Sequence, residues 1–279
     1  MNHYIHDYYV EAGRIAAKVR TETLSMIKED IPLLEIAEFV EKRIEDLGGK
    51  PAFPCNISIN EIASHYTPQD YLQCFRKGDV VKLDLGAHID GYIADTAITV
   101  EVGTDYHGKL IRTCQEALNK AIGFIKNRVE TNHIGKIIED TIKEQGFNPI
   151  KDLTGHSMER YNLHAGVTIP NYKSFFSHTV KKDMVFAIEP FATYGNGNIK
   201  NGLPLIFAIN DKVKGNSAQE IRRSFSSLPF APRWVPHIDI KELKGAREYY
   251  EMIEKDGEIV VQSEHTVIVS EEGCEVITI

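Results

Sequence analysis

Two aspartates in a predicted β-hairpin are the first candidates for chemistry in this sequence. The β-rich runs VVKLDLGA and YIADTAITVEV flank residues 88–91, where Asp90 and Gly91 favour a tight turn. A two-residue turn at Ile89 and Asp90 sets Asp84 directly opposite Asp95, with Cβ atoms about 4.5–5.5 Å apart. The neighbouring residues are apolar on both faces, which indicates burial. A buried carboxylate pair needs a shared proton, a basic partner or a cation.

The register of this hairpin leaves alternatives open. A bulge at Gly91 would shift the pairing by one residue. One aspartate would be exposed at a strand end in another arrangement, with the second capping a backbone group. Further acidic residues in apolar surroundings argue against that arrangement.

Glu189 and Glu264 are the acidic residues with the most apolar surroundings. Glu189 closes the run MVFAI, and Glu264 lies inside the predicted strand 260–269. A lone glutamate in a buried strand is rare unless it is paired. His156 lies in the small-residue segment TGHS, a predicted turn that would present its imidazole to a cleft, although a hydrogen-bonded loop histidine is the simpler interpretation.

These five residues together resemble a metal-binding set. Four carboxylates carry four negative charges, which two divalent cations would offset. Oxygen-rich ligands with one imidazole suit Mn, Fe, Co or Zn rather than a thiolate-type structural zinc. Two ions about 3.5–4 Å apart hold a bridging water, lower its pKa and polarise a substrate carbonyl.

Helices and strands that would position these residues follow from the apolar periodicity. Helices are predicted at 8–28, at 33–47, from about 109, and at 134–143. Buried strands are predicted at 184–192 and 259–270, and 51–65 is predicted as a loop with one short strand-like piece. The more polar segment 211–257, which includes IKELKGAREYYEMI, is predicted to be a small helical insert.

Composition narrows the class of protein. The net charge is −8 without a cluster of five Lys or Arg residues, so a nucleic-acid surface is not expected. Four widely spaced cysteines form no CxxC pair and fit a reducing cytosol. No apolar run approaches a membrane span, and the polar start MNHYIHDYY has no signal-peptide core. A cytoplasmic protein is therefore expected. A monomer is expected because the sequence shows no evident association surface.

Several longer segments resemble methionine aminopeptidases, specifically type 2. The matching pieces are PAFPCNISINEIASHYTP (51–68), VVKLDLGAHIDGYIADTAITV (80–100), TGHSMERYNLHAGVTIP (154–170), AIEPFATYGNG (187–197) and QSEHTVIV (262–269). They stand in the family's order and cover most of the chain. LPFAPRW resembles the insert that type 1 enzymes lack, and the start close to the first helix resembles the archaeal form.

The resemblance implies an α+β pita-bread fold, with an antiparallel sheet flanked by helices and a small helical insert. It divides the chain into a catalytic domain at 1–210 and 258–279 and an insert at 211–257. It also implies a hydrolase that removes the N-terminal methionine from nascent polypeptides when the second residue is small. A hydroxide bridging two divalent ions would attack the first peptide carbonyl. Association with the ribosome stays open, because no charged N-terminal extension precedes the first helix.

Roles for single residues also follow from the resemblance. Asp84 would chelate one metal, Asp95 and Glu264 would bridge both, and His156 and Glu189 would complete the set. Glu189 would also accept a proton. His65 and His164 would contact the substrate at the scissile amide and the tetrahedral intermediate. The wall of the methionine pocket would include Phe53, Pro54, Asn56 and Ile57.

Two rival functions remain. A prolidase or Pro-specific aminopeptidase would share the fold and the ligands, but those enzymes usually carry a large N-terminal domain. A catalytically inactive relative acting as a binding protein would be expected to lose metal ligands, and all five are present here. No HExxH, GxSxG or P-loop motif suggests another chemistry.

Overall fold

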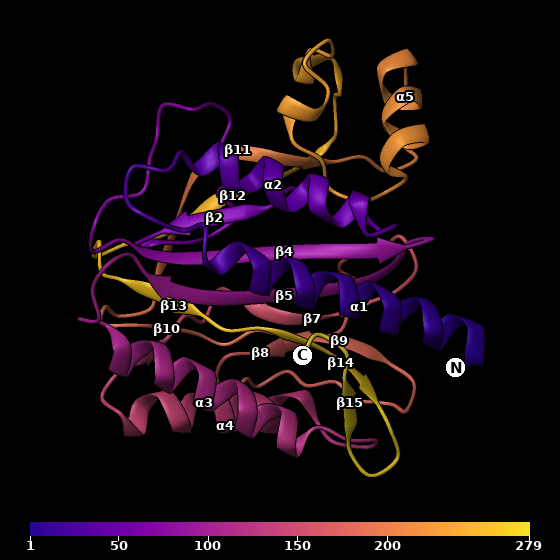
Figure 1. Ribbon diagram of the computed structural model, residues 1–279. Coiled ribbons are helices and arrows are strands. Elements are labelled where there is room, and N and C mark those ends of the chain that lie inside the picture. Colours follow the sequence, from indigo (N-terminus) through magenta and orange to yellow (C-terminus); the bar gives the residue numbers. More distant parts are fainter.

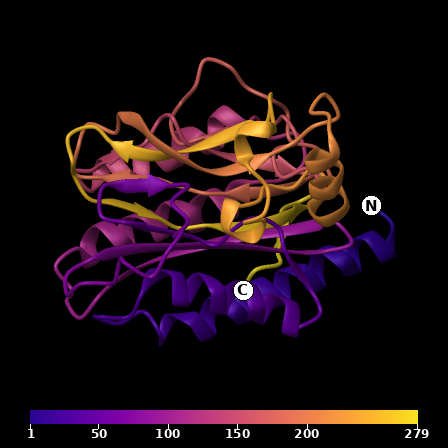
Figure 2. The same ribbon diagram turned by 90° about the horizontal axis from the view of Figure 1, so that it is seen from above.

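The computed structural model describes residues 1–279 as antiparallel sheets flanked by two helix pairs. Helix α1 lies along β4 and β5, with α2 beside α1 and next to β1 and β2, and α3 and α4 lie on the other side of the strands (Figure 1). Seen from above, the α1–α2 pair forms one outer layer, with the strands behind it (Figure 2). The predicted α+β class with helix-flanked antiparallel strands is confirmed.

The helices are α1 (His3–Leu24), α2 (Leu33–Asp46), α3 (Gly108–Phe124), α4 (Thr131–Glu144) and α5 (Asn216–Phe225), with short 3₁₀ turns η1 (Pro232–Trp234) and η2 (Ile240–Glu242). The strands are β1 (Lys50–Pro51), β2 (Asn56–Ile59), β3 (Ile62–Ser64), β4 (Val80–Ile89), β5 (Tyr92–Glu101), β6 (Asn148–Pro149), β7 (Thr154–Met158), β8 (Thr168–Pro170), β9 (Val185–Ile188), β10 (Phe191–Thr193), β11 (Ile199–Ala208), β12 (Arg247–Glu254), β13 (Val260–Gln262), β14 (His265–Val269) and β15 (Cys274–Val276).

Each helix pair buries an apolar stripe against strands. Ile15 and Val19 of α1 and Ile36 and Val40 of α2 pack on Leu83 of β4 in one core cluster. The second cluster joins α3 and α4 to β9, β13 and β14. Three of the four predicted helices begin or end within about five residues of the observed bounds, and α1 begins earlier, at His3, than the periodicity suggested. The two cores hold the intervening strands rigidly, which is what a precise site requires.

The β4–β5 hairpin turns at Asp90 and Gly91 instead of the predicted Ile89 and Asp90. Asp90 has a φ of 49° and Gly91 a φ of 85°, as a type I′ turn requires at both central positions. β-Branched Ile89 is disfavoured at positive φ, so it pairs with Tyr92 as the last strand position. The predicted turn was therefore wrong by one residue at each position.

This change moves the two aspartates relative to each other. Asp84 pairs with Ala97, and Asp95 pairs with Gly86, so the predicted direct opposition is wrong. Because side chains alternate along a strand, Asp84 and Gly86 share a face. Asp84 and Asp95 are therefore diagonal neighbours on the same face. The error in register did not separate them.

The predicted strands 184–192 and 259–270 are each interrupted. β9 and β10 are separated at Glu189 and Pro190, and β13 and β14 are separated at Ser263 and Glu264. Glu189 closes its strand as predicted, whereas Glu264 lies at a break and not inside a continuous strand. The segment TGHS, predicted as a turn, belongs to strand β7.

The segment 211–257 is only partly helical. α5, η1 and η2 occupy its first part, around a small core that includes Ile221, Phe230 and Leu243. Residues 247–254 were predicted as helix but form β12, which pairs with β11 and β3. Tyr249 and Tyr250 have a high strand propensity, and pairing with β11 and β3 stabilises the strand in place of the predicted helix. No helix of the protein is long and apolar enough to cross a membrane.

Candidate metal centre

Five side chains from separate parts of the chain line one small cavity of about 230 Å³. Asp84 comes from β4, Asp95 from β5 and His156 from β7, while Glu189 and Glu264 come from the two strand breaks. Their exposed fractions are 8% for Asp84, 4% for Asp95, 6% for His156 and 1% for Glu264. All five predicted metal-binding residues are thus brought together in a buried place.

Two glycines make room for this arrangement. A Cβ on Gly86 would lie 2.4 Å from Cε1 of Phe53, so the glycine lets that ring cross the strand beside Asp84 and Asp95. A Cβ on Gly155 would lie 2.6 Å from the Ala187 carbonyl oxygen, so the glycine permits β7 to approach β9. These contacts explain the glycines of the DLG and GH motifs by close packing.

The backbone at Glu264 is held by β5. Ala97 and Glu264 form an isolated antiparallel bridge, in which the Glu264 amide donates to the Ala97 carbonyl at 3.0 Å. The Thr96 hydroxyl donates to the Glu264 carbonyl at 2.9 Å, and Arg20 of α1 donates to that hydroxyl. Glu264 therefore owes its position to a strand far away in sequence.

Close contacts connect the ligand candidates. Nε2 of His156 lies 3.3 Å from Oε1 of Glu189 and 3.8 Å from Oδ2 of Asp95. The Gln262 amide nitrogen lies 3.4 Å from Oδ2 of Asp84 and 3.3 Å from Oε2 of Glu264, so it donates toward both carboxylates. Ligand atoms of Asp95, His156 and Glu264 all lie within 4.8 Å of one another.

Burial raises the pKa of all four carboxyl groups, and repulsion between their charges raises the pKa of three of them further. Desolvation raises the pKa of Asp84 to about 7. Desolvation, followed by the Asp84 charge, raises the pKa of Asp95 well above its usual range. The same causes, with Asp95 the largest charge, raise the pKa of Glu189 and Glu264. Four carboxylates cannot all remain ionised here without an added positive charge.

The donor set fits divalent cations. Oδ1 of Asp84 and Oδ1 of Asp95 are buried and have no hydrogen-bond partner. Desolvation lowers the pKa of His156 to about 4, so the imidazole is neutral near pH 7 and its ring offers a lone pair. Unpaired carboxylate oxygens with one neutral imidazole are suitable ligands for Mn, Fe, Co or Zn.

His65 and His164 lie on the wall of the same cavity. Nδ1 of His65 donates to the Tyr250 carbonyl at 3.2 Å, which leaves its Nε2 as an acceptor. His164 stacks on Tyr249, with ring centroids 5.8 Å apart, and lies 4.3 Å from the His156 ring. Desolvation lowers the pKa of both histidines, that of His65 to about 4.

The residues predicted for the methionine pocket divide between two faces. Phe53 and Asn56 line the cavity, whereas Pro54 and Ile57 are not among the lining residues. Ile57 is fully buried in the cluster under α1 and α2. Adjacent residues of β2 point to opposite faces, so Asn56 and Ile57 cannot both face the cavity. The apolar wall is completed by residues that the sequence did not single out: Leu153, Leu163, Ile206, Pro229 and Met252.

Three polar residues of the site were missed from the sequence. Arg247 and Tyr249 lie in the segment that was predicted to be helical. They are two positions apart, which is the spacing of residues on one face of a strand and the feature that indicated a strand here. Gln262 precedes Glu264 by two, the spacing of residues that share a strand face. His88 is 7% exposed, and its Nδ1 accepts a hydrogen bond from the Gly91 amide at 3.0 Å beneath the turn.

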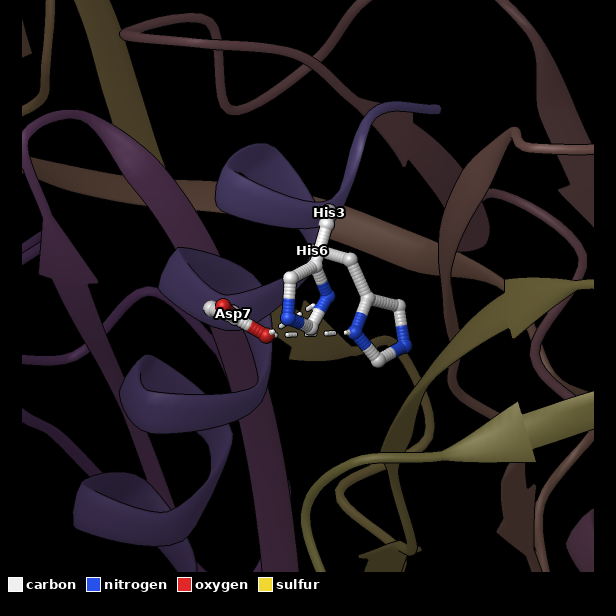
Figure 3. Close-up of side chains that lie close together, drawn as sticks. All are labelled: His3, His6 and Asp7. Carbon is white, nitrogen blue, oxygen red and sulfur yellow. Dashed lines mark ion pairs between the residues drawn. The ribbon is translucent and has the colours of Figure 1, made fainter.

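Two other places deserve comparison with this cavity. A larger hollow of about 650 Å³ lies between α2 and α5, but its buried Glu41 is already bound by Arg233 and by the Trp234 indole. At the start of α1, His3, His6 and Asp7 also come close together (Figure 3). Those side chains are exposed or half-buried and form ion pairs with each other, so neither place shows unpaired buried ligands.

Comparison with known proteins agrees with the geometry. The chain is 43% identical to a methionine aminopeptidase from Methanothermobacter thermautotrophicus, with 97% of each chain covered. It is 45% identical to a methionine aminopeptidase from Pyrococcus horikoshii, covering 98% of this chain and 99% of that one. The structure of a methionine aminopeptidase from Thermotoga maritima superimposes with a TM-score of 0.77 at 25% identity, covering 100% and 98% of the two chains.

The predicted pita-bread fold and the predicted metallopeptidase class are both confirmed by these similarities. Residues 7–271 match metallopeptidase family M24, a range that includes most of α1, the other three helices of the two pairs and the whole cavity. The chain therefore belongs to metallopeptidase family M24, with archaeal methionine aminopeptidases as its relatives.

Proposed function

We propose that this chain is a type 2 methionine aminopeptidase that removes the N-terminal methionine from nascent polypeptides whose second residue is small. The observation that carries the proposal is the meeting of one imidazole and four carboxylates, three of them buried and that of Glu189 only 12% exposed, in one small, partly apolar cavity. Identity of 43–46% to the archaeal enzymes over nearly the whole chain supports the same activity.

Asp84, Asp95, His156, Glu189 and Glu264 would hold two divalent ions, chosen from Mn, Fe, Co and Zn. Asp84 would chelate one ion, Asp95 and Glu264 would bridge both, and His156 and Glu189 would complete the second. The unpaired oxygens of the two aspartates support a role for both as metal ligands. When bound, the ions activate a water molecule and polarise the first carbonyl of the substrate.

The two further histidines have complementary roles. Because Nδ1 of His65 donates to the Tyr250 carbonyl, its Nε2 accepts and is suited to the N–H of the scissile amide. Neutral His164 has one N–H, which would stabilise the developing charge on the carbonyl oxygen. Glu189, whose side chain is 12% exposed, would take the proton from water and deliver it to the leaving amine.

The dimensions of the cavity support removal of one residue at a time. Its volume of about 230 Å³ is below the 300–1,000 Å³ typical of clefts for drug-sized ligands. Phe53, Leu163 and Met252 supply an apolar surface for the methionine side chain. Little space then remains beyond the scissile bond, which favours Gly, Ala or Ser as the second residue.

The finer assignments are part of the same proposal. The segment 211–257, with LPFAPRW, would be the type 2 insert, and 1–210 with 258–279 the catalytic domain. Nascent chains as substrates agree with an enzyme of the cytoplasm, and four free cysteines agree with a reducing compartment. A monomeric state is expected, and association with the ribosome stays open.

An assay of the metal-free protein reconstituted separately with Mn, Fe, Co and Zn tests the function. Peptides that begin Met-Ala, Met-Val and Xaa-Pro are compared. We expect rapid methionine release from Met-Ala, slower release from Met-Val and none from the protein without metal.

The rival functions make different predictions in this assay. Cleavage confined to Xaa-Pro peptides would assign the chain to the prolidase group. Metal binding measured by calorimetry without turnover of any peptide would indicate an inactive binding protein. Either result would overturn the proposed function.

A further inference from the structure

Arg247 is a cation at the cavity that the proposed reaction does not use. It begins β12, lines the cavity and is exposed to solvent, so it lies at the rim. It is the one Lys or Arg among the lining residues, and its guanidinium forms no ion pair with any carboxylate. An unpaired charge beside a substrate pocket is available to a ligand.

The guanidinium is held in place by an aromatic ring. Its Cζ lies 4.7 Å from the centroid of the Tyr249 ring, a cation–π distance. That ring in turn contacts the His65 ring edge-on at 5.6 Å and stacks on His164 at 5.8 Å. Tyr249 therefore contacts both the guanidinium of Arg247 and the rings of the two histidines.

The positive charge of Arg247 affects the histidines of the cavity. After desolvation and other contributions, Arg247 helps to lower the pKa of His65, His156 and His164. The four buried carboxylates would be offset by bound cations, which leaves Arg247 as a positive charge at the rim. The cavity lining also includes one exposed carboxylate, that of Asp152. It accepts a hydrogen bond from the Ile199 amide at 3.2 Å and is therefore directed toward that backbone.

We propose that Arg247 makes the enzyme prefer substrates with a carboxylate side chain at the third position, just beyond the small second residue. This proposal rests on the methionine-removing function proposed above. An extended peptide advances about 3.3–3.6 Å per residue, so two residues past the scissile amide span a distance comparable with one ring layer. In the proposed binding mode the third side chain lies at the mouth of the cavity, near the exposed Arg247.

Arg247 has a simpler alternative role. Its side chain could act only by packing on Tyr249 or by its effect on the histidines. Either role would change turnover of all peptides by the same factor. Only the proposed role predicts that the effect of changing Arg247 depends on the charge of the substrate's third residue.

The test uses amidated peptides Met-Ala-Xaa-Ser with Asp, Asn or Lys at Xaa, because amidation removes the terminal carboxylate. Metal-loaded wild type, R247Q, R247K and R247E are compared by kcat/KM at low and high salt. R112E, an exposed change of equal charge on distant α3, is the control. We expect wild type to prefer Asp over Lys by about two- to fivefold, the range reached by partly exposed ion pairs. R247K and R112E keep the preference, R247Q removes it, and R247E reverses it.

High salt should reduce the preference of wild type, because exposed charges are screened. Equal kcat/KM for the three peptides in wild type would overturn the proposal, as would an R247E variant that scales all three equally. Melting temperatures show whether each variant is folded, and R247Q decides the matter if R247E is not. No release from any Met-Ala peptide by wild type would instead contradict the proposed function itself.

Discussion

Two groups of histidine and carboxylate side chains in this protein are close enough to share a cation, and they differ in their surroundings. Asp95, His156 and Glu264 form the buried group, and His3, His6 and Asp7 form the surface group (Figure 3). In each group the ligand atoms lie within 4.8 Å of one another. Proximity therefore does not distinguish them.

Solvation and pairing do distinguish them. The side chains of His3 and Asp7 are 84% and 54% exposed, and His6 pairs with Glu275 at 2.7 Å. Water and these neighbours satisfy the charges, so ion pairs there contribute little. Asp95 has a buried carboxylate oxygen without a hydrogen-bond partner. A cation removes a large electrostatic penalty in the buried group and almost none in the surface group.

The strongest test of this difference is to replace one carboxylate in each group. Glu264→Gln should lower kcat/KM for a Met-Ala-Ser peptide by more than about a hundredfold, since even partners behind metal ligands cost 10–100-fold. It should also weaken metal binding measured by calorimetry. The matched surface change Asp7→Asn should alter neither. Undiminished turnover in Glu264→Gln would remove the metal assignment.

The metal-free protein should lose stability as pH rises from about 6.5 to 8. The carboxyl groups of Asp84, Asp95, Glu189 and Glu264 have raised pKa values, that of Asp84 about 7. The folded state therefore binds more protons than the unfolded state above pH 4. The stabilisation is complete below the unfolded pKa and is lost as pH rises through the folded pKa. The expected slope is about 1.4 kcal/mol per pH unit for each carboxyl still protonated.

Histidines act in the opposite direction at lower pH. The pKa of His65 and of His156 is lowered to about 4, so their contribution grows between pH 4 and 6.5 and is constant above. Above pH 6.5 the histidines therefore no longer contribute to the slope. Desolvation lowers the pKa of the buried Lys82 well below its usual value, which gives a slope of opposite sign, so the difference between the profiles with and without metal reports the carboxyl groups. Urea titrations with and without metal measure the slope, and bound metal should flatten it. A flat profile without metal would mean that the buried carboxyls are already ionised.

The smallest effect is expected at the surface group. The double change His3→Ala and Asp7→Ala should alter the free energy of unfolding by less than about 0.5 kcal/mol, as for most exposed sites. Metal affinity and kcat/KM should stay the same. Loss of a bound metal ion in this variant would show that the surface group competes with the buried one, contrary to the comparison.

The helices and the hairpin could be predicted because their signals are local. Periodic apolar residues predicted α2, α3 and α4, and Asp90 with Gly91 indicated a tight turn. The errors arose where distant partners decide. Arg247–Glu254 forms a strand because β11 and β3 supply its hydrogen-bond partners. Glu264 lies between β13 and β14, where its backbone pairs with Ala97 of β5.

The sequence by itself determined which residues were available for chemistry. Its motifs identified the five ligand candidates and the two histidines, and the resemblance that they carry predicted the enzyme class that the relatives confirm. Only the tertiary structure decided their surroundings: the diagonal placement of Asp84 and Asp95, their unpaired oxygens, and the layer of Arg247 and Tyr249 at the rim. Residue types and turns are encoded within a few positions, whereas burial and pairing depend on chain segments that meet only after folding.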